Sequence, residues 1–182
     1  MRQLIAPMAL IVSLSVTTGA HAMGELIGGD INFKGTVVAL GCSIVPSSKH
    51  VAVDFGEIST RTLYAEKKSP PQEFKIELQG CNSEIFKSVT VTFSGTKNAN
   101  MDDRLAITSI SPNSASGIGV GLEESDGTAI MLDTPTSATT ISDATMQLNF
   151  KAFVEGEPDA LKDQTLQTGP FRATANYILN YQ

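Results

Sequence analysis

The apolar residues of this chain alternate with polar or small ones over short stretches, at a period of two rather than the 3.6 of a helix. This alternation is typical of strands with one buried face. It recurs in Val51, Val53 and Phe55; Phe74, Ile76 and Leu78; Val89, Val91 and Phe93; Ile118, Val120 and Leu122; and Met146, Leu148 and Phe150. Clusters of Pro, Ser, Asn and Gly separate the stretches, as at residues 46–48 and 111–114. The pattern predicts an all-β, antiparallel sandwich of the immunoglobulin type, with a small barrel as the alternative fold.

Length and charge limit the classes of function. A chain of 182 residues allows one domain and a short appendage, and 41% hydrophobic residues can fill a core. The formal net charge is −6, and no block of Lys and Arg occurs. Nucleic acids and anionic membranes select clustered positive charge, so neither is expected as a partner.

The first 22 residues have the features of a secretory signal peptide. Arg2 precedes an apolar run at residues 4–16, and Ala20 and Ala22 supply the small residues of a cleavage site. The run is shorter than the roughly 20 residues that a membrane helix needs. We therefore expect an exported chain that begins at Met23 and does not insert into a membrane.

The chain has two cysteines, Cys42 and Cys81, and both belong to the exported part. Exported thiols meet an oxidising compartment, where they tend to pair. A metal or redox pair would need CxxC spacing or a histidine partner, and the sequence has neither. The interpretation is one structural disulfide.

Candidates for catalysis are few. His50 is the one histidine that follows the signal peptide, and the nucleophile motif GxSxG does not occur. The acidic groups at residues 102–103 and 123–126 lack the pattern of a calcium loop. The glycines of residues 117–121 have no Lys-Ser/Thr after them, so they more plausibly thin a strand for close packing than bind phosphate. No catalytic residue, metal or cofactor is expected, and the chain is not predicted to be an enzyme.

Both ends of the exported chain alternate strongly. Near the N-terminus one face of an extended segment would carry Ile27, Gly29, Ile31 and Phe33. The segment could be an ordinary first strand. At the C-terminus one face would carry Phe171, Ala173, Ala175, Tyr177, Leu179 and Tyr181, while the other face is polar apart from Ile178.

An ordered set of sequence features resembles the chaperone-usher fimbrial subunits, or pilins, of Gram-negative bacteria, and within them the type 1 major-subunit group. The set comprises the run GGDINFKGTVV at residues 28–38 leading into Cys42; the second cysteine, Cys81; the run GIGVGL at residues 117–122 followed by Asp126-Gly127; and Gly169 with the penultimate Tyr181. The resemblance covers the whole exported chain.

The resemblance implies an immunoglobulin-like sandwich that lacks its last strand. It divides the chain into a signal peptide (1–22), a donor-strand extension (23–34) and a pilin domain (35–182). The groove-facing donor residues would be Ile27, Gly29, Ile31 and Phe33; a register shifted by one residue would use Leu26 in place of Ile27. The edge of the groove that a chaperone binds would run from Gly169 through Phe171, Ala173, Ala175, Tyr177 and Leu179 to Tyr181.

The same resemblance implies a function in assembly. The subunit would polymerise head to tail by donor-strand exchange with neighbouring subunits, through a periplasmic chaperone and an outer-membrane usher, into a surface fimbria that supports cell adhesion. Within the family the chain could be a rod subunit, a minor adaptor or a terminator. Outside it, a secreted carbohydrate-binding sandwich is the alternative, which would be stable without a partner strand.

Overall fold

The computed structural model describes residues 28–37 and 41–182. The predicted signal peptide, and Leu26 and Ile27, lie outside the described residues. The chain divides into two units, Met1–Val37 and Val38–Gln182. In the first unit, residues 28–37 form neither helix nor strand and are all exposed.

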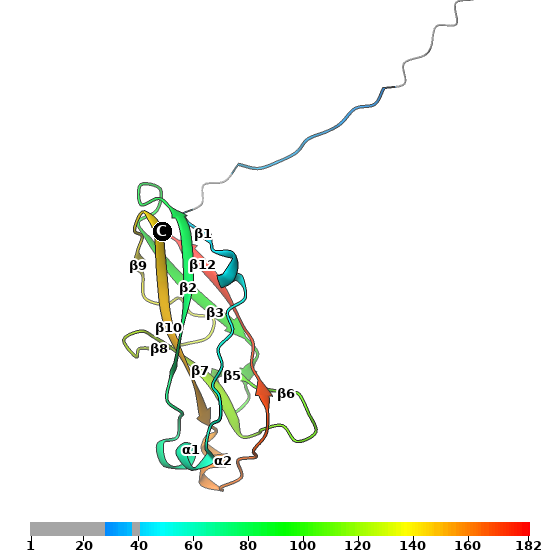
Figure 1. The fold of residues 1–182 in the computed structure, drawn as a ribbon, viewed down its shortest axis with the longest axis vertical. Helices are drawn as coiled ribbons and strands as arrows, with labels where there is room; N and C mark the ends of the chain where they lie inside the picture. Colours follow the sequence, from blue (N-terminus) through cyan, green and yellow to red (C-terminus); the bar gives the residue numbers. More distant parts are fainter. Residues whose placement is uncertain (1–27, 38–40) are drawn as a thin grey trace, which may run out of the picture. The chain divides into compact units, whose positions relative to one another are not determined.

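The second unit is built from two antiparallel sheets that face each other across one core (Figure 1). The larger sheet has the order β1 (Ser43–Ile44), β2 (Gln72–Cys81), β10 (Ala144–Gly156), β7 (Ile118–Glu124), β5 (Met101–Ala106) and β4 (Lys97–Asn98), with β8 (Ala129–Ile130) paired to β7. The smaller sheet has the order β12 (Ala175–Tyr181), β3 (Ser88–Gly95) and β9 (Thr139–Thr140). A short pair is formed by β11 (Phe171–Arg172) and β6 (Thr108–Ser109). This arrangement confirms the predicted all-β sandwich.

The core lies between the inward faces of the two sheets. Ile76 on β2 and Val91 on β3 are 0% and 1% exposed. The rings of Phe93 on β3 and Phe150 on β10 meet edge to face with their centroids 5.1 Å apart, a favoured arrangement for two aromatic rings. The period-two stretches that the sequence marks supply these inward residues, which is why the alternation located the strands correctly.

Three local features differ from the sequence prediction. In the stretch that carries Val51, Val53 and Phe55, the last two are half-buried as predicted but Val51 is 38% exposed, and the stretch pairs with no strand in the described structure. The predicted final strand is divided into β11 and β12. Short helices that the sequence did not predict occur at η1 (Pro46–Lys49), α1 (Thr60–Glu66) and α2 (Pro158–Lys162). They are too short for apolar residues to repeat with the 3.6-residue period of a helix.

The glycines of β7 allow close packing, as predicted. Gly121 lies opposite Phe153 of β10, and a Cβ at Gly121 would overlap the ring of that phenylalanine. The ring is 2% exposed. Lys68 Nζ and Arg104 Cζ lie 4.8 and 5.1 Å from the ring centroid, so two cations and a glycine hold the ring in place.

Replacing Gly121 with alanine is expected to destabilise the chain by about 1 to 3 kcal/mol, the usual cost of overpacking a site that cannot rearrange. The midpoint of denaturation in guanidinium measures the effect. Gly28→Ala is the matched control, because nothing lies within 4 Å of a Cβ placed there. Equal midpoints for the two variants would mean that the Phe153 ring can move aside.

Candidate functional site

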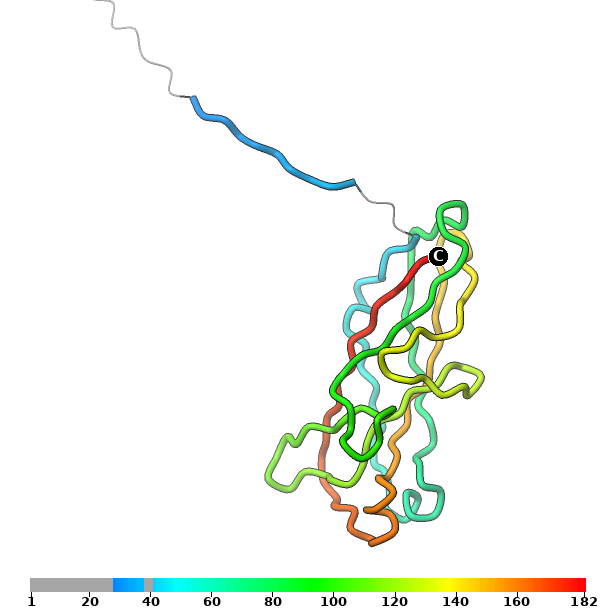
Figure 2. The backbone as a smooth tube through the Cα atoms, turned by 180° about the vertical axis from the view of Figure 1, so that it is seen from behind, coloured from blue at the N-terminus to red at the C-terminus, as the bar shows by residue number. Residues whose placement is uncertain are grey.

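A groove with a volume of about 1190 Å³ runs along the sandwich beside the C-terminal strand. One wall is formed by residues 49–56 and the other by residues 169–177. The floor comes from both sheets, through Phe74, Ile76, Phe93, Leu105, Val120, Leu122 and Ala152. Figure 2 shows the first wall, drawn in cyan, running beside the final strand, drawn in red.

The two walls face each other with unused backbone edges. β12 is the edge strand of its sheet and pairs with β3 alone, and residues 51–59 belong to no strand. An edge strand presents a row of unpaired N–H and C=O groups. The groove therefore offers main-chain hydrogen bonds as well as apolar side chains.

The final strand alternates as the sequence predicts. Phe171, Ala173, Ala175, Tyr177, Leu179 and Tyr181 are half-buried against the core. The residues between them are exposed, and Ile178 is 58% exposed. Of the predicted edge residues, those from Gly169 to Tyr177 line the groove, whereas Leu179 and Tyr181 lie beyond its end.

Two tyrosines close the groove at that end. The Tyr177 hydroxyl donates to the carbonyl of Ser48 at 2.7 Å, and the Tyr181 hydroxyl donates to the carbonyl of Cys42 at 3.2 Å. Burial raises the pKa of both phenols, so each remains a protonated donor at neutral pH. These two hydrogen bonds of β12 therefore hold residues 42–48, which lead into the first wall.

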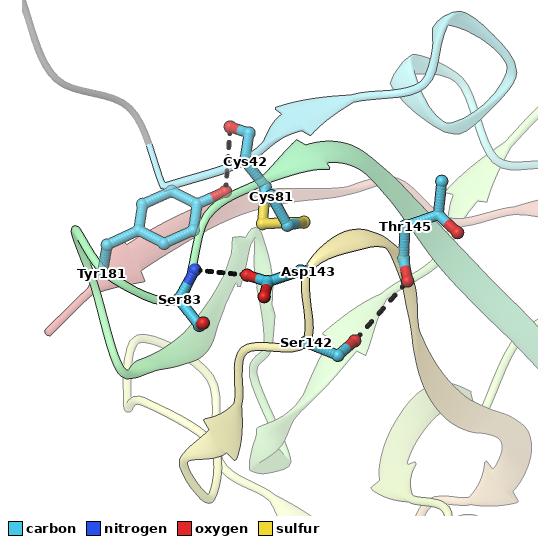
Figure 3. The surroundings of a disulfide bond; sticks show 7 residues. All are labelled: Cys42, Cys81, Ser83, Ser142, Asp143, Thr145 and Tyr181. Atoms are coloured by element: carbon cyan, nitrogen blue, oxygen red, sulfur yellow. Dashed lines mark hydrogen bonds between the residues drawn. A yellow bond between two sulfur atoms is a disulfide. The ribbon is translucent and has the colours of Figure 1, made fainter.

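The predicted disulfide lies at the same end. Cys42, just before β1, is bonded to Cys81, the last residue of β2 (Figure 3). Beside it, Asp143 accepts a hydrogen bond from the backbone N–H of Ser83, which lowers the pKa of that carboxyl group. The covalent bond and the tyrosine hydroxyls therefore anchor the same stretch of chain.

The other end is marked by aromatic rings and a glycine. Phe55 and Phe171, one from each wall, stack with their centroids 6.2 Å apart. Gly169 lies in the bend before β11 with φ of +151°, and a Cβ there would overlap the backbone of residues 113–115. The chain therefore turns at Gly169 before it enters β11.

The predicted donor residues within the described segment are fully accessible. Ile31 is 77% exposed and Phe33 is 89% exposed. Gly29 has nothing within 4 Å of a Cβ built on it. The same parity continues through Gly35 to Val37, which is also exposed, so the alternation extends three residues past Lys34.

Among the described residues, several other charged groups pair with one another. Glu123 pairs with Lys68, and Arg104 pairs with both Asp103 and Glu155. Within residues 28–37 and 41–182, no three His, Cys, Asp or Glu side chains come together as metal ligands would. The described helices are all too short or too polar to cross a membrane.

Sequence reasoning missed the wall at residues 49–56. The alternation correctly predicted that Val53 and Phe55 are half-buried, but a period of two does not reveal whether the stretch pairs with another strand. The hydroxyl contacts of Tyr177 and Tyr181 were equally invisible, because they join positions more than 120 residues apart.

A β-sandwich with a free edge strand beside an apolar groove defines a subunit that is open to strand addition. The family model for fimbrial proteins matches residues 31–182. The chain is 36% identical over its whole length to PmfF of Proteus mirabilis, a protein named as a minor fimbrial subunit, and the match covers all of that protein. It is 31% identical to the major MR/P fimbria protein of Proteus mirabilis, over 94% of both chains.

Solved structures agree. The rod subunit PapA of the P pilus superposes with a TM-score of 0.67 at 25% identity, covering 79% of this chain and 100% of PapA. A subunit of a chaperone-usher pilus gives a TM-score of 0.67 at 26% identity, covering 86% of this chain and 97% of the other. The chain belongs to the fimbrial protein family. It is a structural subunit of a surface fimbria, with the incomplete immunoglobulin-like fold of pilins.

Removing Tyr181 and Gln182 is expected to cost at least 2 to 3 kcal/mol, about the value of one buried aromatic side chain. The truncation also removes the hydrogen bonds that the backbone of Gln182 makes with Lys87 and Ser88. Periplasmic degradation of the subunit, followed by immunoblot, is the measurement. Asn180→Ala is the control, because it removes only an exposed side-chain bond to Thr92 and should cost about 0.5 kcal/mol. Equal subunit levels would contradict the role given to the strand end.

Proposed function

We propose that the groove is the acceptor site for a donor strand, and that residues 23–37 of a neighbouring subunit are that strand. The observation that carries the proposal is the groove itself, with a free β-strand edge along one wall and none of the described strands between the walls. The donor residues are Gly29, Ile31 and Phe33, continued by Gly35 and Val37 and preceded by Ile27.

The free energy favours filling the groove. The walls hold Val51, Val53, Phe55 and Phe171 partly in water, and the donor segment exposes Ile31, Phe33 and Val37. Each large apolar side chain contributes roughly 1.5 to 3 kcal/mol when buried. Main-chain hydrogen bonds to the edge of β12 add to this, and the ordering of a free segment opposes it.

Assembly then proceeds head to tail. The donor segment lies at one end of the chain and the acceptor groove is formed by other residues, so the contact is heterologous and propagates as a fibre. Before assembly, a periplasmic chaperone covers the edge from Gly169 to Tyr181, and an outer-membrane usher exchanges the chaperone for the next subunit. The chain acts as a structural and not a catalytic protein; His50 is exposed on the rim of the groove.

Deleting residues 24–37 tests the proposal, because it separates accepting from donating. The shortened chain is expected to bind a synthetic peptide of residues 24–37, with a large rise in melting temperature, but to form no fibres alone. A carbohydrate-binding sandwich would be stable without the peptide and indifferent to it. That result would refute the proposal.

A further inference from the structure

The N-terminal segment is joined to the sandwich by a short linker and a fixed anchor. Three residues, 38–40, separate Val37 from Gly41, and four successive Cα steps span at most about 14 Å. Gly41 is buried, and a Cβ placed there would lie 2.6 Å from the ring of Tyr181. Its carbonyl accepts the backbone N–H of Asn82 at 3.0 Å. A segment seated in a neighbour's groove therefore keeps the anchor of its own subunit within about 14 Å of the point where Val37 leaves the groove.

The surface beside this anchor carries an exposed apolar side chain. The turn at residues 82–87 lies against the anchor, because the ring of Phe86 packs with its centroid 5.6 Å from that of Tyr181. Ile85, in the same turn, is 48% exposed. The turn contains one acidic and one basic residue, so it has no net charge. A body next to the exit of the segment meets Ile85.

The end of the groove at which a neighbour's segment leaves decides what that body is. At the disulfide end, the hydroxyls of Tyr177 and Tyr181 join the walls, and the subunit's own segment departs from Gly41. A subunit that also received its neighbour there would hold two other domains at one end. If the neighbour's segment leaves past Phe55 and Phe171, each neighbour has an end of its own, as a propagating head-to-tail contact requires.

That end of the groove also carries an exposed isoleucine. Ser109 of β6 pairs with Phe171 of β11, so Ile110 follows directly beside the groove wall, where it is 51% exposed. The Ser114 hydroxyl accepts the backbone N–H of Ile110 at 2.9 Å, which holds the loop in one shape. Residues 107–117 contain no charged side chain. Figure 1 shows β6 towards the end of the second unit opposite to the C-terminus.

We propose that neighbouring copies of this chain in a fibre make a second contact outside the groove, in which the turn at residues 82–87 of the donating copy packs on the loop at residues 110–114 of the accepting copy, with Ile85 against Ile110. The inference rests on the proposed function and adds to it a docking surface between the two domains. Single exposed apolar side chains are common on proteins. These two differ because the short linker brings their surfaces together and neither surface has a net charge to oppose the contact. The contact fixes the angle between two domains that the linker alone would leave free to hinge.

Cysteine pairs test the contact in assembled fibres. In a chain that carries Ile85→Cys and Ile110→Cys, the contact places thiols of adjacent copies within bonding reach. Fibres of this variant, heated in detergent without reductant, should give a ladder of covalent multimers that reductant collapses to monomer. Ile85→Cys with Ile178→Cys is the matched control, because Ile178 is 58% exposed on the outward face of β12. It should give no ladder.

Three results would overturn the contact. They are fibres of the first pair without a ladder, an equal ladder from the control pair, and an equal yield of dimers from Ile85→Cys alone. The last result would place the disulfide ends of two copies side by side.

Alanine variants separate the contact from the groove and do not depend on added cysteines. Ile85→Ala and Ile110→Ala should each speed the release of subunits from fibres in guanidinium about fivefold, as expected when a half-buried isoleucine is lost from an interface. The double variant should release subunits no faster than the faster single variant, because both changes remove one contact. Ile178→Ala should leave the rate unchanged.

A peptide of residues 24–37, added to the full chain before assembly, distinguishes the two levels of the argument. The peptide lacks the turn at residues 82–87, so it should bind the Ile110→Ala chain as tightly as the natural chain. Unchanged release rates, or effects that multiply in the double variant, would overturn the contact while the groove remains an acceptor. A peptide that binds neither chain would refute the acceptor groove and this inference with it.

Discussion

A chain carrying Ile31→Asp and Phe33→Asp is expected to fold and to accept a donor strand, but to form no fibres. Both side chains are largely exposed in the subunit, at 77% and 89%, so their loss costs little stability there. In the junction, the change removes roughly 3 to 6 kcal/mol of apolar burial. It would also place two carboxylates in an apolar groove, which adds a desolvation cost.

Electron microscopy of cells that express only the variant measures the result. Asn32→Asp is the matched control, because it adds the same kind of charge to the same segment on the outward parity. It should leave fibres nearly normal. Normal fibres from the double variant, or their absence from the control, would contradict the assignment of Ile31 and Phe33 to the inward face.

Much of this architecture could be predicted from the sequence, because burial of one face imposes a period of two wherever a strand forms. The alternation marked inward residues on β2, β3, β7 and β10, although it missed Ala152 and Val154 in the second half of β10. The alternation of the final segment was also predicted, although the structure divides it into two strands and exposes Ile178, the exception to its polar face. The disulfide followed from having two exported cysteines.

What the sequence could not give were the relations between distant segments. The alternation at Val51, Val53 and Phe55 is the same for a paired strand and for the wall of a groove, since periodicity measures burial and not hydrogen bonding. Likewise, the glycines of β7 indicated close packing, but the sequence did not show what they pack against. The ring that fills the space belongs to Phe153 of β10, which pairs with Gly121 although it lies 32 positions later in the sequence. Contacts of this kind depend on the topology of the whole sheet.

Replacing Cys42 and Cys81 with serine is expected to prevent accumulation of the subunit. The bond closes a loop with a sequence separation of 39, for which the chain-entropy model gives about 4 kcal/mol. Domains are typically stable by only about 5 to 15 kcal/mol, and we expect a subunit with an unfilled apolar groove to be near the lower end of this range. The bond also anchors Cys42, whose carbonyl accepts the Tyr181 hydroxyl, so its loss loosens both walls where they meet.

The immunoblot level of the serine variant in the periplasm, compared with the natural chain, measures this loss. Because the disulfide lies where the two walls meet, a strand that joins the walls should compensate for its loss. In the proposed junction a donor strand would pair with both walls, so the variant refolded with a peptide of residues 24–37 should recover a folded state, whereas without the peptide it should stay unfolded. A peptide that carries Ile31→Asp and Phe33→Asp should give no recovery. A serine variant as stable as the natural chain without any peptide would show that the tyrosine contacts and the core alone hold the walls, and the disulfide would then lose the role given to it.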